Sequence, residues 1–207
     1  MVAGLALSVI RDEMQLALLQ ENKDVDLTHF HHIIKHLVEV FPMLGRPFRN
    51  IRNDITDVNE DLLQMQSGRR GHHYRSCLSM VRFELRAGFT TSPSGCGVGV
   101  LNALNRILKY LILLLQETKD LPGNTSIRRV ARRLYDQILA PHNLWMERQV
   151  VRMALLTLPR QAELIHRLRG NLGAEEFSEL RENVETYGTE VFTRIEAIIN
   201  QHQLQDV

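Results

Sequence analysis

The apolar residues between positions 48 and 65 recur at intervals of three and four, which is the period of one face of an α-helix. This repeat consists of Phe48, Ile51, Ile55, Val58, Leu62 and Met65. A second repeat of the same kind, nearer the C-terminus, consists of Phe177, Leu180, Val184, Val191, Ile195 and Ile198. No segment shows the alternation of apolar and polar residues that a half-buried strand requires. The sequence therefore predicts an all-α protein.

Residues that interrupt helices separate these periodic segments at short intervals. Gly, Pro, Asn or Ser gather at 22–26, 42–47, 67–71, 90–99, 121–126, 159 and 170–173. These breaks predict about seven or eight helices joined by short connections. The chain has 207 residues and no long linker, so we expect one domain over 1–207.

Charge and cysteine content exclude several classes of protein. The chain has 25 Lys and Arg against 24 Asp and Glu, so it lacks the basic excess of a nucleic-acid-binding protein. Its two cysteines are too few for a disulfide framework, which favours a reduced, cytoplasmic protein. The longest apolar run, at 110–115, is much shorter than the roughly 20 residues of a membrane span. No secretory signal is apparent, and we expect a soluble protein.

The segment 101–116 is apolar on nearly all sides, which is typical of a helix in the middle of a packed domain. It nevertheless carries a narrow polar stripe, formed by Asn102, Asn105, Arg106 and Lys109. A charged stripe on a buried helix must reach solvent, a partner charge or a polar ligand, because burying it unpaired is costly. The sequence leaves these three possibilities open.

A histidine-rich segment raises the question of a metal site. His29, His32, His36 and Glu39 fall on one helical face, and imidazoles at this spacing can bind zinc. The alternative is a solvated face, and we expect no metal. A two-metal carboxylate enzyme in a helical bundle would need two Glu-x-x-His motifs. Only Glu163 and His166 fit this motif.

Other catalytic or cofactor motifs are not recognisable. The Gly-rich segment 94–99 matches neither the dinucleotide fingerprint nor the phosphate loop. We interpret it as a loop before a helix whose N-terminus could also meet an anion. No local signature of a Ser or Cys nucleophile is present, so we expect no enzymatic activity and no cofactor. A cluster of arginines at 128–133 is interpreted as a solvated face or a membrane contact.

Short motifs then follow one another along most of the chain. They are Leu37-Val38, Leu44-Gly45, Phe48, Ile51, Asp54, His73-Tyr74-Arg75-Ser76, Met80-Val81, Glu84-Leu85, Ser94-Gly95-Cys96, Arg106, Leu108, Leu111, Trp145, Arg148 and Thr157-Leu158-Pro159. In this order and with nearly constant spacing, they resemble the glycolipid transfer protein superfamily. The closest likeness is to its ceramide-1-phosphate transfer branch.

This resemblance implies a two-layer helical sandwich that takes one sphingolipid from a membrane without catalysis. The lipid chains would enter an apolar pocket between the layers, and the headgroup would lie at a polar surface site. The expected partners are a sphingolipid and, transiently, a membrane surface, with the protein itself a monomer. The alternative is a lipid-sensing or scaffolding member that lacks transfer activity.

The resemblance also implies roles for individual residues. Asp54 would accept hydrogen bonds from the sphingosine amide or a hydroxyl group. His142 would complete recognition of the amide, although it precedes Trp145 by three residues and Asn143 holds the strictly aligned position. Trp145 would dock on the membrane, since an amphipathic ring suits the bilayer interface; the alternative is a half-buried core residue.

The headgroup signature of the superfamily is missing from this sequence. Its cationic positions correspond to Val58, Gly99 and Ala103 or, with the gap placed differently, to Val58, Gly97 and Leu101. The headgroup is therefore left open.

Three polar residues near these positions are the replacement candidates: Asn102, Arg106 and Arg52. Arg106 is the first choice because a guanidinium binds phosphate through two parallel hydrogen bonds. Its alternative role is a structural ion pair.

Overall fold

The computed structural model describes residues 3–91, 96–205 and 207. Within these ranges it contains helices and turns, with isolated bridges but no strand. The α-helices are α1 (Ala3–Ala17), α2 (Leu27–Leu44), α3 (Phe48–Ser67), α4 (Cys77–Ala87), α5 (Gly97–Thr118), α6 (Arg128–Ile138), α7 (Trp145–Leu155), α8 (Gln161–Arg169) and α9 (Ala174–Gln201). Short 3-10 helices lie between them: η1 (Glu21–Lys23), η2 (Gly71–His73), η3 (Phe89–Thr91) and η4 (Ala140–His142).

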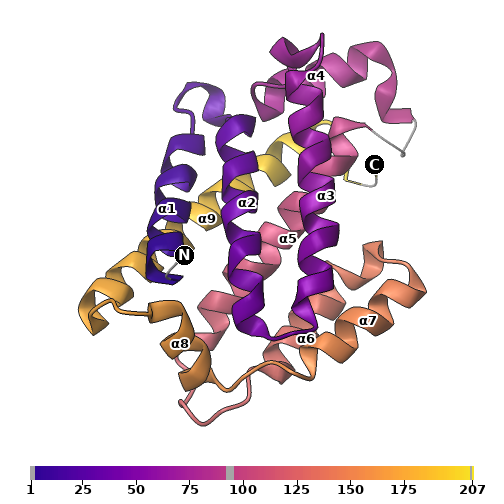
Figure 1. The fold of residues 1–207 in the computed structure, drawn as a ribbon. Coiled ribbons are helices and arrows are strands. Elements are labelled where there is room, and N and C mark those ends of the chain that lie inside the picture. The colour runs from indigo at the N-terminus through magenta and orange to yellow at the C-terminus, as the bar shows by residue number, and fades with distance from the viewer. Residues whose placement is uncertain (1–2, 92–95, 206) are drawn as a thin grey trace.

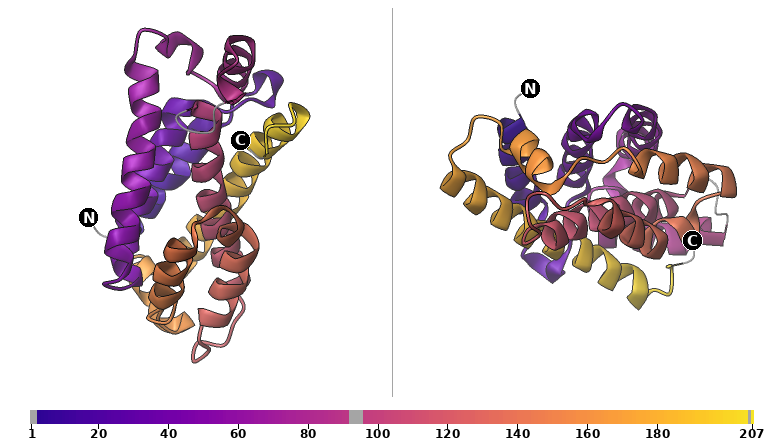
Figure 2. Two further views of the ribbon diagram at one scale, coloured as in Figure 1. Left: turned by 90° about the vertical axis from the view of Figure 1, so that its right-hand side faces the viewer. Right: turned by 90° about the horizontal axis from the view of Figure 1, so that it is seen from below.

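The helices form two layers. In Figure 1, α1, α2 and α3 lie side by side in the front layer, and α5 and α9 cross behind them. The two turned views in Figure 2 show α6 beside α5 in the second layer. Helix α4 covers one end of the sandwich, α8 the other, and α7 packs against α6. The all-α, two-layer arrangement expected from the sequence is confirmed.

Helix α5 runs through the centre of this arrangement. Its apolar residues Leu101, Leu104 and Leu108 are fully buried. By length and composition alone α5 is the one described helix that could cross a membrane, but half of its most apolar stretch is buried inside the fold. The central position of α5 explains why it is apolar on nearly all sides, because a helix that packs against both layers is buried all round.

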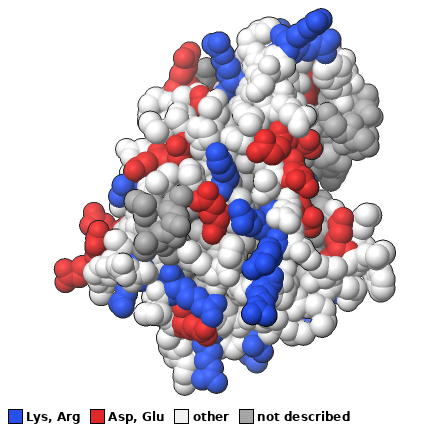
Figure 3. All heavy atoms as spheres, in the orientation of Figure 1, with Lys and Arg blue, Asp and Glu red and all other residues white. Residues whose placement is uncertain are grey.

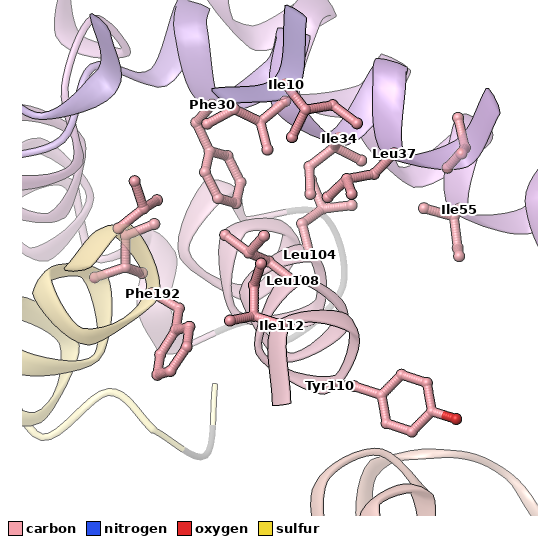
Figure 4. Close-up of a cluster of buried hydrophobic side chains, with 14 of the residues drawn as sticks. Ile10, Phe30, Ile34, Leu37, Ile55, Leu104, Leu108, Tyr110, Ile112 and Phe192 are labelled. Carbon is pink, nitrogen blue, oxygen red and sulfur yellow. The ribbon is translucent and has the colours of Figure 1, made fainter. Parts of the chain in front are cut away.

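The core fills the space between the two layers. Figure 4 shows side chains of the first layer, including Phe30 and Ile34, directed toward Leu104, Leu108 and Ile112 of α5. The periodic residues of α3 contribute Phe48, Ile55 and Leu62 to this core. As the three-and-four spacing predicted, α3 has one face buried in the core and the opposite face in solvent.

The start of α5 is stabilised by a carboxylate from a neighbouring helix. Glu84 of α4, 1% exposed, accepts hydrogen bonds from the backbone N–H groups of Gly97 at 2.6 Å and Val98 at 3.0 Å. Gly97 has no room for a side chain, since an added Cβ would lie 2.9 Å from Cε1 of Tyr74 and from Glu84 Oε1. The N-terminus of α5 therefore binds a carboxylate, that of Glu84, which belongs to the protein itself. Residues 94 and 95 of the Gly-rich segment lie outside the described part of the chain.

Candidate functional site

An apolar cavity lies between the two layers. Its volume is about 80 Å³. All of its lining residues are apolar: Leu7, Leu37, Val40, Phe41, Leu44, Leu111, Ile112, Leu114, Leu115, Leu164, Leu168 and Val184. Pockets that enclose a small molecule usually measure about 300–1,000 Å³, so this cavity is too small for long acyl chains as it stands. A ligand with such chains requires the layers to move apart.

Two of the predicted headgroup residues lie on α3. Asp54 is exposed and directly precedes Ile55, which is buried in the core. Arg52, half-buried, lies on the same helix. Within the described ranges no hydrogen bond or ion pair is formed by either side chain. Because they are two residues apart on a helix, they point in different directions. Val58, one turn beyond Asp54, packs against the core and offers no polar group.

The polar side chains along α5 contact the C-terminal segment and α9. The Asn102 amide donates to the carbonyl of Leu204 at 2.9 Å, and the Arg106 guanidinium donates to the carbonyl of Gln205 at 2.8 Å. Further along the stripe, Lys109 forms an ion pair with Glu196 of α9 at 2.7 Å. Asn102 and Arg106 thus have partners within the described part of the protein, and their role as replacements for the headgroup cations stays a prediction. Their donors satisfy carbonyl groups at the end of the chain, where a helix leaves backbone acceptors without partners.

The remaining amide-recognition candidate lies just before α7. His142 ends η4 and is exposed. The next residue, Asn143, donates from its amide to the hydroxyl of Tyr135 at 3.1 Å and accepts at its carbonyl from Arg148 Nε at 2.9 Å. Burial raises the pKa of Tyr135, while the bond from Asn143 opposes that rise. Asn143 is thus held by the fold, and His142 is the residue that faces outward.

An exposed apolar patch covers α7 and the residues that flank it. Glu147 caps the helix by accepting a hydrogen bond from the Leu144 N–H at 2.8 Å. Trp145 is 70% exposed, which excludes the half-buried alternative. The patch, which we call the α7 patch, consists of Leu144, Trp145, Met146, Val150, Met153 and Leu156, each more than half exposed. In Figure 3 the surface over α7 is mostly free of charged groups, whereas both signs alternate elsewhere on this face.

The α7 patch was only partly predictable from the sequence. Trp145 was identified, but Val150 and Met153 were not. Their spacing follows a helical period, which could have indicated an apolar face. Periodicity does not tell whether such a face meets the core or solvent.

The arginines at 128–133 lie on α6 at the surface. Arg132 contacts Asp136 at 3.8 Å, and Arg133 forms an ion pair with Glu117. Arg128 donates from Nε to the carbonyl of Leu158 at 3.2 Å. These contacts agree with the solvated-face interpretation and leave the membrane contact a prediction.

The histidine face of α2 is divided between two carboxylates. His29 and His32 both approach Glu13 of α1 through Nδ1. His36 instead lies beside Glu39, with 3.6 Å between Nδ1 and Oε2. Glu13 was absent from the sequence prediction, because the spacing of residues within one segment says nothing about a carboxylate on another helix.

Comparison with known proteins identifies the family. Residues 25–170 match the family model described as Glycolipid transfer protein (GLTP). This chain belongs to the glycolipid transfer protein family. The match spans α2 to α8, and the resemblance seen in the sequence motifs is confirmed.

Similar members of the family include ceramide-1-phosphate transfer proteins. That of Xenopus laevis is 24% identical over 197 residues, covering 92% of this chain and 90% of that protein. The mouse protein in its apo-form has a TM-score of 0.88 at 22% identity, covering 97% of this chain and 98% of that chain. The human protein in complex with 2:0 ceramide-1-phosphate has a TM-score of 0.86 at 23% identity, covering 99% and 98% of the two chains. The two structures establish the likeness of fold.

Proposed function

We propose that this protein carries a ceramide-based sphingolipid, ceramide-1-phosphate or a related lipid, between membranes without catalysing a reaction. The lipid transfer proteins of this family are non-enzymatic carriers. The observation that carries the proposal is the wholly apolar cavity between the two helical layers. The similar human protein of the same fold binds ceramide-1-phosphate.

The energetics favour a carrier whose selectivity comes from polar contacts. Each buried methylene gains roughly 0.8 kcal/mol on leaving water. In a bilayer the lipid chains are already out of water, so moving them into the apolar interior of the protein changes the free energy little. A buried polar group left unpaired costs about 1–3 kcal/mol. The contacts to the amide and the headgroup therefore decide which lipid is bound.

Asp54 is the proposed acceptor for the amide or hydroxyl hydrogens of the sphingoid base. It is exposed on α3 and has no partner within the described ranges. Arg52 on the same helix is the proposed cation for an anionic headgroup, and His142 the second contact to the amide. Arg106 stays a candidate for the same headgroup, since its guanidinium has five N–H donors and one of them is hydrogen-bonded to the carbonyl of Gln205.

The α7 patch is the proposed membrane-docking surface. Large exposed apolar patches mark interaction sites, because apolar surface is costly to keep in water. Trp145 lies at the start of this patch, and an indole ring suits the bilayer interface. We propose that the protein acts as a monomer in the cytoplasm and binds membranes transiently through this surface.

A vesicle-to-vesicle transfer assay with fluorescent ceramide-1-phosphate tests the proposal. We expect the wild-type protein to move the lipid and Asp54→Val to abolish movement while its circular dichroism spectrum stays unchanged. Asp57→Val is the matched control, because Asp57 is also an exposed carboxylate of α3. Mass spectrometry of lipid that co-purifies with the protein then identifies the headgroup.

Three results would count against the proposal as stated. Wild-type transfer by Asp54→Val removes Asp54 from the site. Equal loss in Asp54→Val and Asp57→Val indicates a general effect of charge on α3. Lipid binding without movement between vesicles contradicts transfer and supports the lipid-sensing alternative.

A further inference from the structure

We propose that Glu13, His29 and His32 form a zinc-binding site that links α1 to α2. One ligand atom from each of the three residues lies within 4.8 Å of the ligand atoms of the other two. The three residues are unrelated to the lipid carrier function proposed above, which uses α3 and the η4–α7 region.

The local fold directs the three side chains to one point. Asp26 caps α2 by accepting from the backbone N–H groups of Thr28 at 2.8 Å and His29 at 3.1 Å, which sets the start of the helix. His29 and His32, three residues apart, then lie on the same face of α2. Helix α1 packs against this face and supplies Glu13.

The two distances from the Glu13 carboxylate are close to those of tetrahedral coordination. Glu13 Oε2 lies 2.8 Å from His29 Nδ1 and 3.4 Å from His32 Nδ1. With zinc–nitrogen and zinc–oxygen bonds of about 2.0–2.2 Å, neighbouring ligand atoms of a tetrahedron are about 3.3–3.6 Å apart. One distance already has this value, and the other requires an outward movement of about half an ångström. The rings of His29 and His32 are 6.2 Å apart between centroids, with an angle of 83° between their planes.

The ligand chemistry favours a transition metal, of which zinc is the one we propose, over magnesium and calcium. Two imidazoles and one carboxylate suit zinc, whereas magnesium and calcium prefer oxygen ligands. The side chains are partly exposed, at 18% for Glu13, 33% for His29 and 41% for His32, so water can reach the fourth position. Binding requires each imidazole to carry its proton on Nε2, which leaves Nδ1 free to bind the metal.

A neighbouring histidine is excluded from this site. The ring of His31 lies 5.6 Å from that of His32, but it is buried. Its Nδ1 is hydrogen-bonded to the carbonyl of Asn59 at 3.2 Å. The bound ion therefore has three protein ligands, two from α2 and one from α1, and it fixes the packing of these helices.

Isothermal titration of the metal-free protein with zinc chloride tests the site. We expect one ion per chain, with Glu13→Gln and His32→Gln each weakening binding at least about tenfold. His36→Gln is the matched control, since His36 lies on the same helix and contacts Glu39 instead. Zinc at a hundredfold excess over its Kd should raise the melting temperature by about 5 °C or more, because it binds the folded state. Magnesium chloride at the same concentration should not.

The titration can also overturn the site. Absence of saturable one-to-one uptake shows that the cluster is held by hydrogen bonds alone. Unchanged affinity in the double variant His29→Gln/His32→Gln shows that zinc binds elsewhere. Loss of binding in His36→Gln would place the ion beside Glu39. Circular dichroism without metal establishes that each variant is folded, and lipid transfer by the same variants is expected to remain, which separates this site from the carrier function.

Discussion

The carboxylate of Glu84 accepts a hydrogen bond from the backbone N–H of Gly97 at 2.6 Å, and so joins α4 to the first turn of the central helix. The same carboxylate accepts from the hydroxyl of Tyr74 at 3.0 Å. Burial, together with the nearby Glu84, raises the pKa of Tyr74, which keeps its hydroxyl protonated as a donor. A single buried group thus serves three donors, two of which belong to α5.

Glu84→Gln should lower the free energy of unfolding by about 1–3 kcal/mol. An amide offers one acceptor oxygen instead of two, and it loses the charge that favours the positive end of the helix. Urea unfolding followed by circular dichroism measures the change. Glu182→Gln, at an exposed position of α9, is the control and should stay within about 0.5 kcal/mol of wild type. Equal stability of the two variants would show that the cap contributes nothing.

Stability should fall as the solution becomes acidic because of His31. This side chain is buried, and burial lowers its pKa from the ordinary value of 6.5 because the protonated ring loses hydration. Below pH 6.5 the unfolded chain therefore binds a proton that the folded chain does not, so stability is lost as pH falls toward the lowered pKa. Above pH 6.5 this contribution is constant.

His31→Gln should reduce the loss of stability between pH 7 and pH 5 and also lower stability at pH 7. The second effect arises because the Asn59 carbonyl loses the imidazole Nδ1 as its partner, and a flexible glutamine amide loses rotamer entropy if it replaces that bond. Unfolding free energies at several pH values give both effects. His166→Gln, an exposed histidine of α8, should keep the wild-type pH dependence. If His31→Gln keeps it as well, the acid sensitivity has another origin.

Membrane binding should depend on the α7 patch. Trp145 is the one tryptophan of the chain, so its fluorescence reports directly on this surface. Addition of phosphatidylcholine vesicles should shift the emission to shorter wavelength as the ring enters the interface. Met153→Glu should weaken vesicle binding about tenfold or more, because burying a methionine contributes about 1.5–3 kcal/mol.

The control for this prediction is Leu16→Glu, which introduces the same charge at an exposed apolar residue of α1. Its vesicle binding should equal that of wild type. Equal weakening in both variants would show that the added negative charge, rather than the α7 patch, governs membrane binding.

Asn102 should hold the C-terminal segment rather than the lipid. Its amide donates to the carbonyl of Leu204, so Asn102→Ala should cost about 1 kcal/mol of stability and speed digestion of the last residues by carboxypeptidase. Lipid transfer should persist. Asn200→Ala, an exposed asparagine of α9, should change neither property. Loss of transfer with unchanged digestion would instead return Asn102 to the headgroup site.

The sequence predicted the positions of some residues in the fold but not the partners of others. The period from Phe48 to Met65 predicted helix α3 and its buried face, because a helix places every third or fourth residue on one side. The all-round apolar composition of 101–116 predicted a central helix. The polar stripe on that helix was recognised, but its partners on α9 and the C-terminal segment were not. Those partners are about 90–100 residues away in the chain.

From residue spacing alone we predicted that 48–65, 101–116 and the C-terminal repeat are helical, which face of α3 is apolar, and a resemblance to a lipid transfer family. About seven or eight helices were expected, and the described residues form nine α-helices. Three features became apparent only in the folded protein: the contact of Arg106 with Gln205, that of Glu13 with His29 and His32, and the exposure of Trp145 to solvent. The physical reason is that helical periodicity depends on neighbours within one turn, whereas these contacts depend on how separate helices pack. The sequence gives the functional group of each side chain, and the packing of the helices determines which group it contacts.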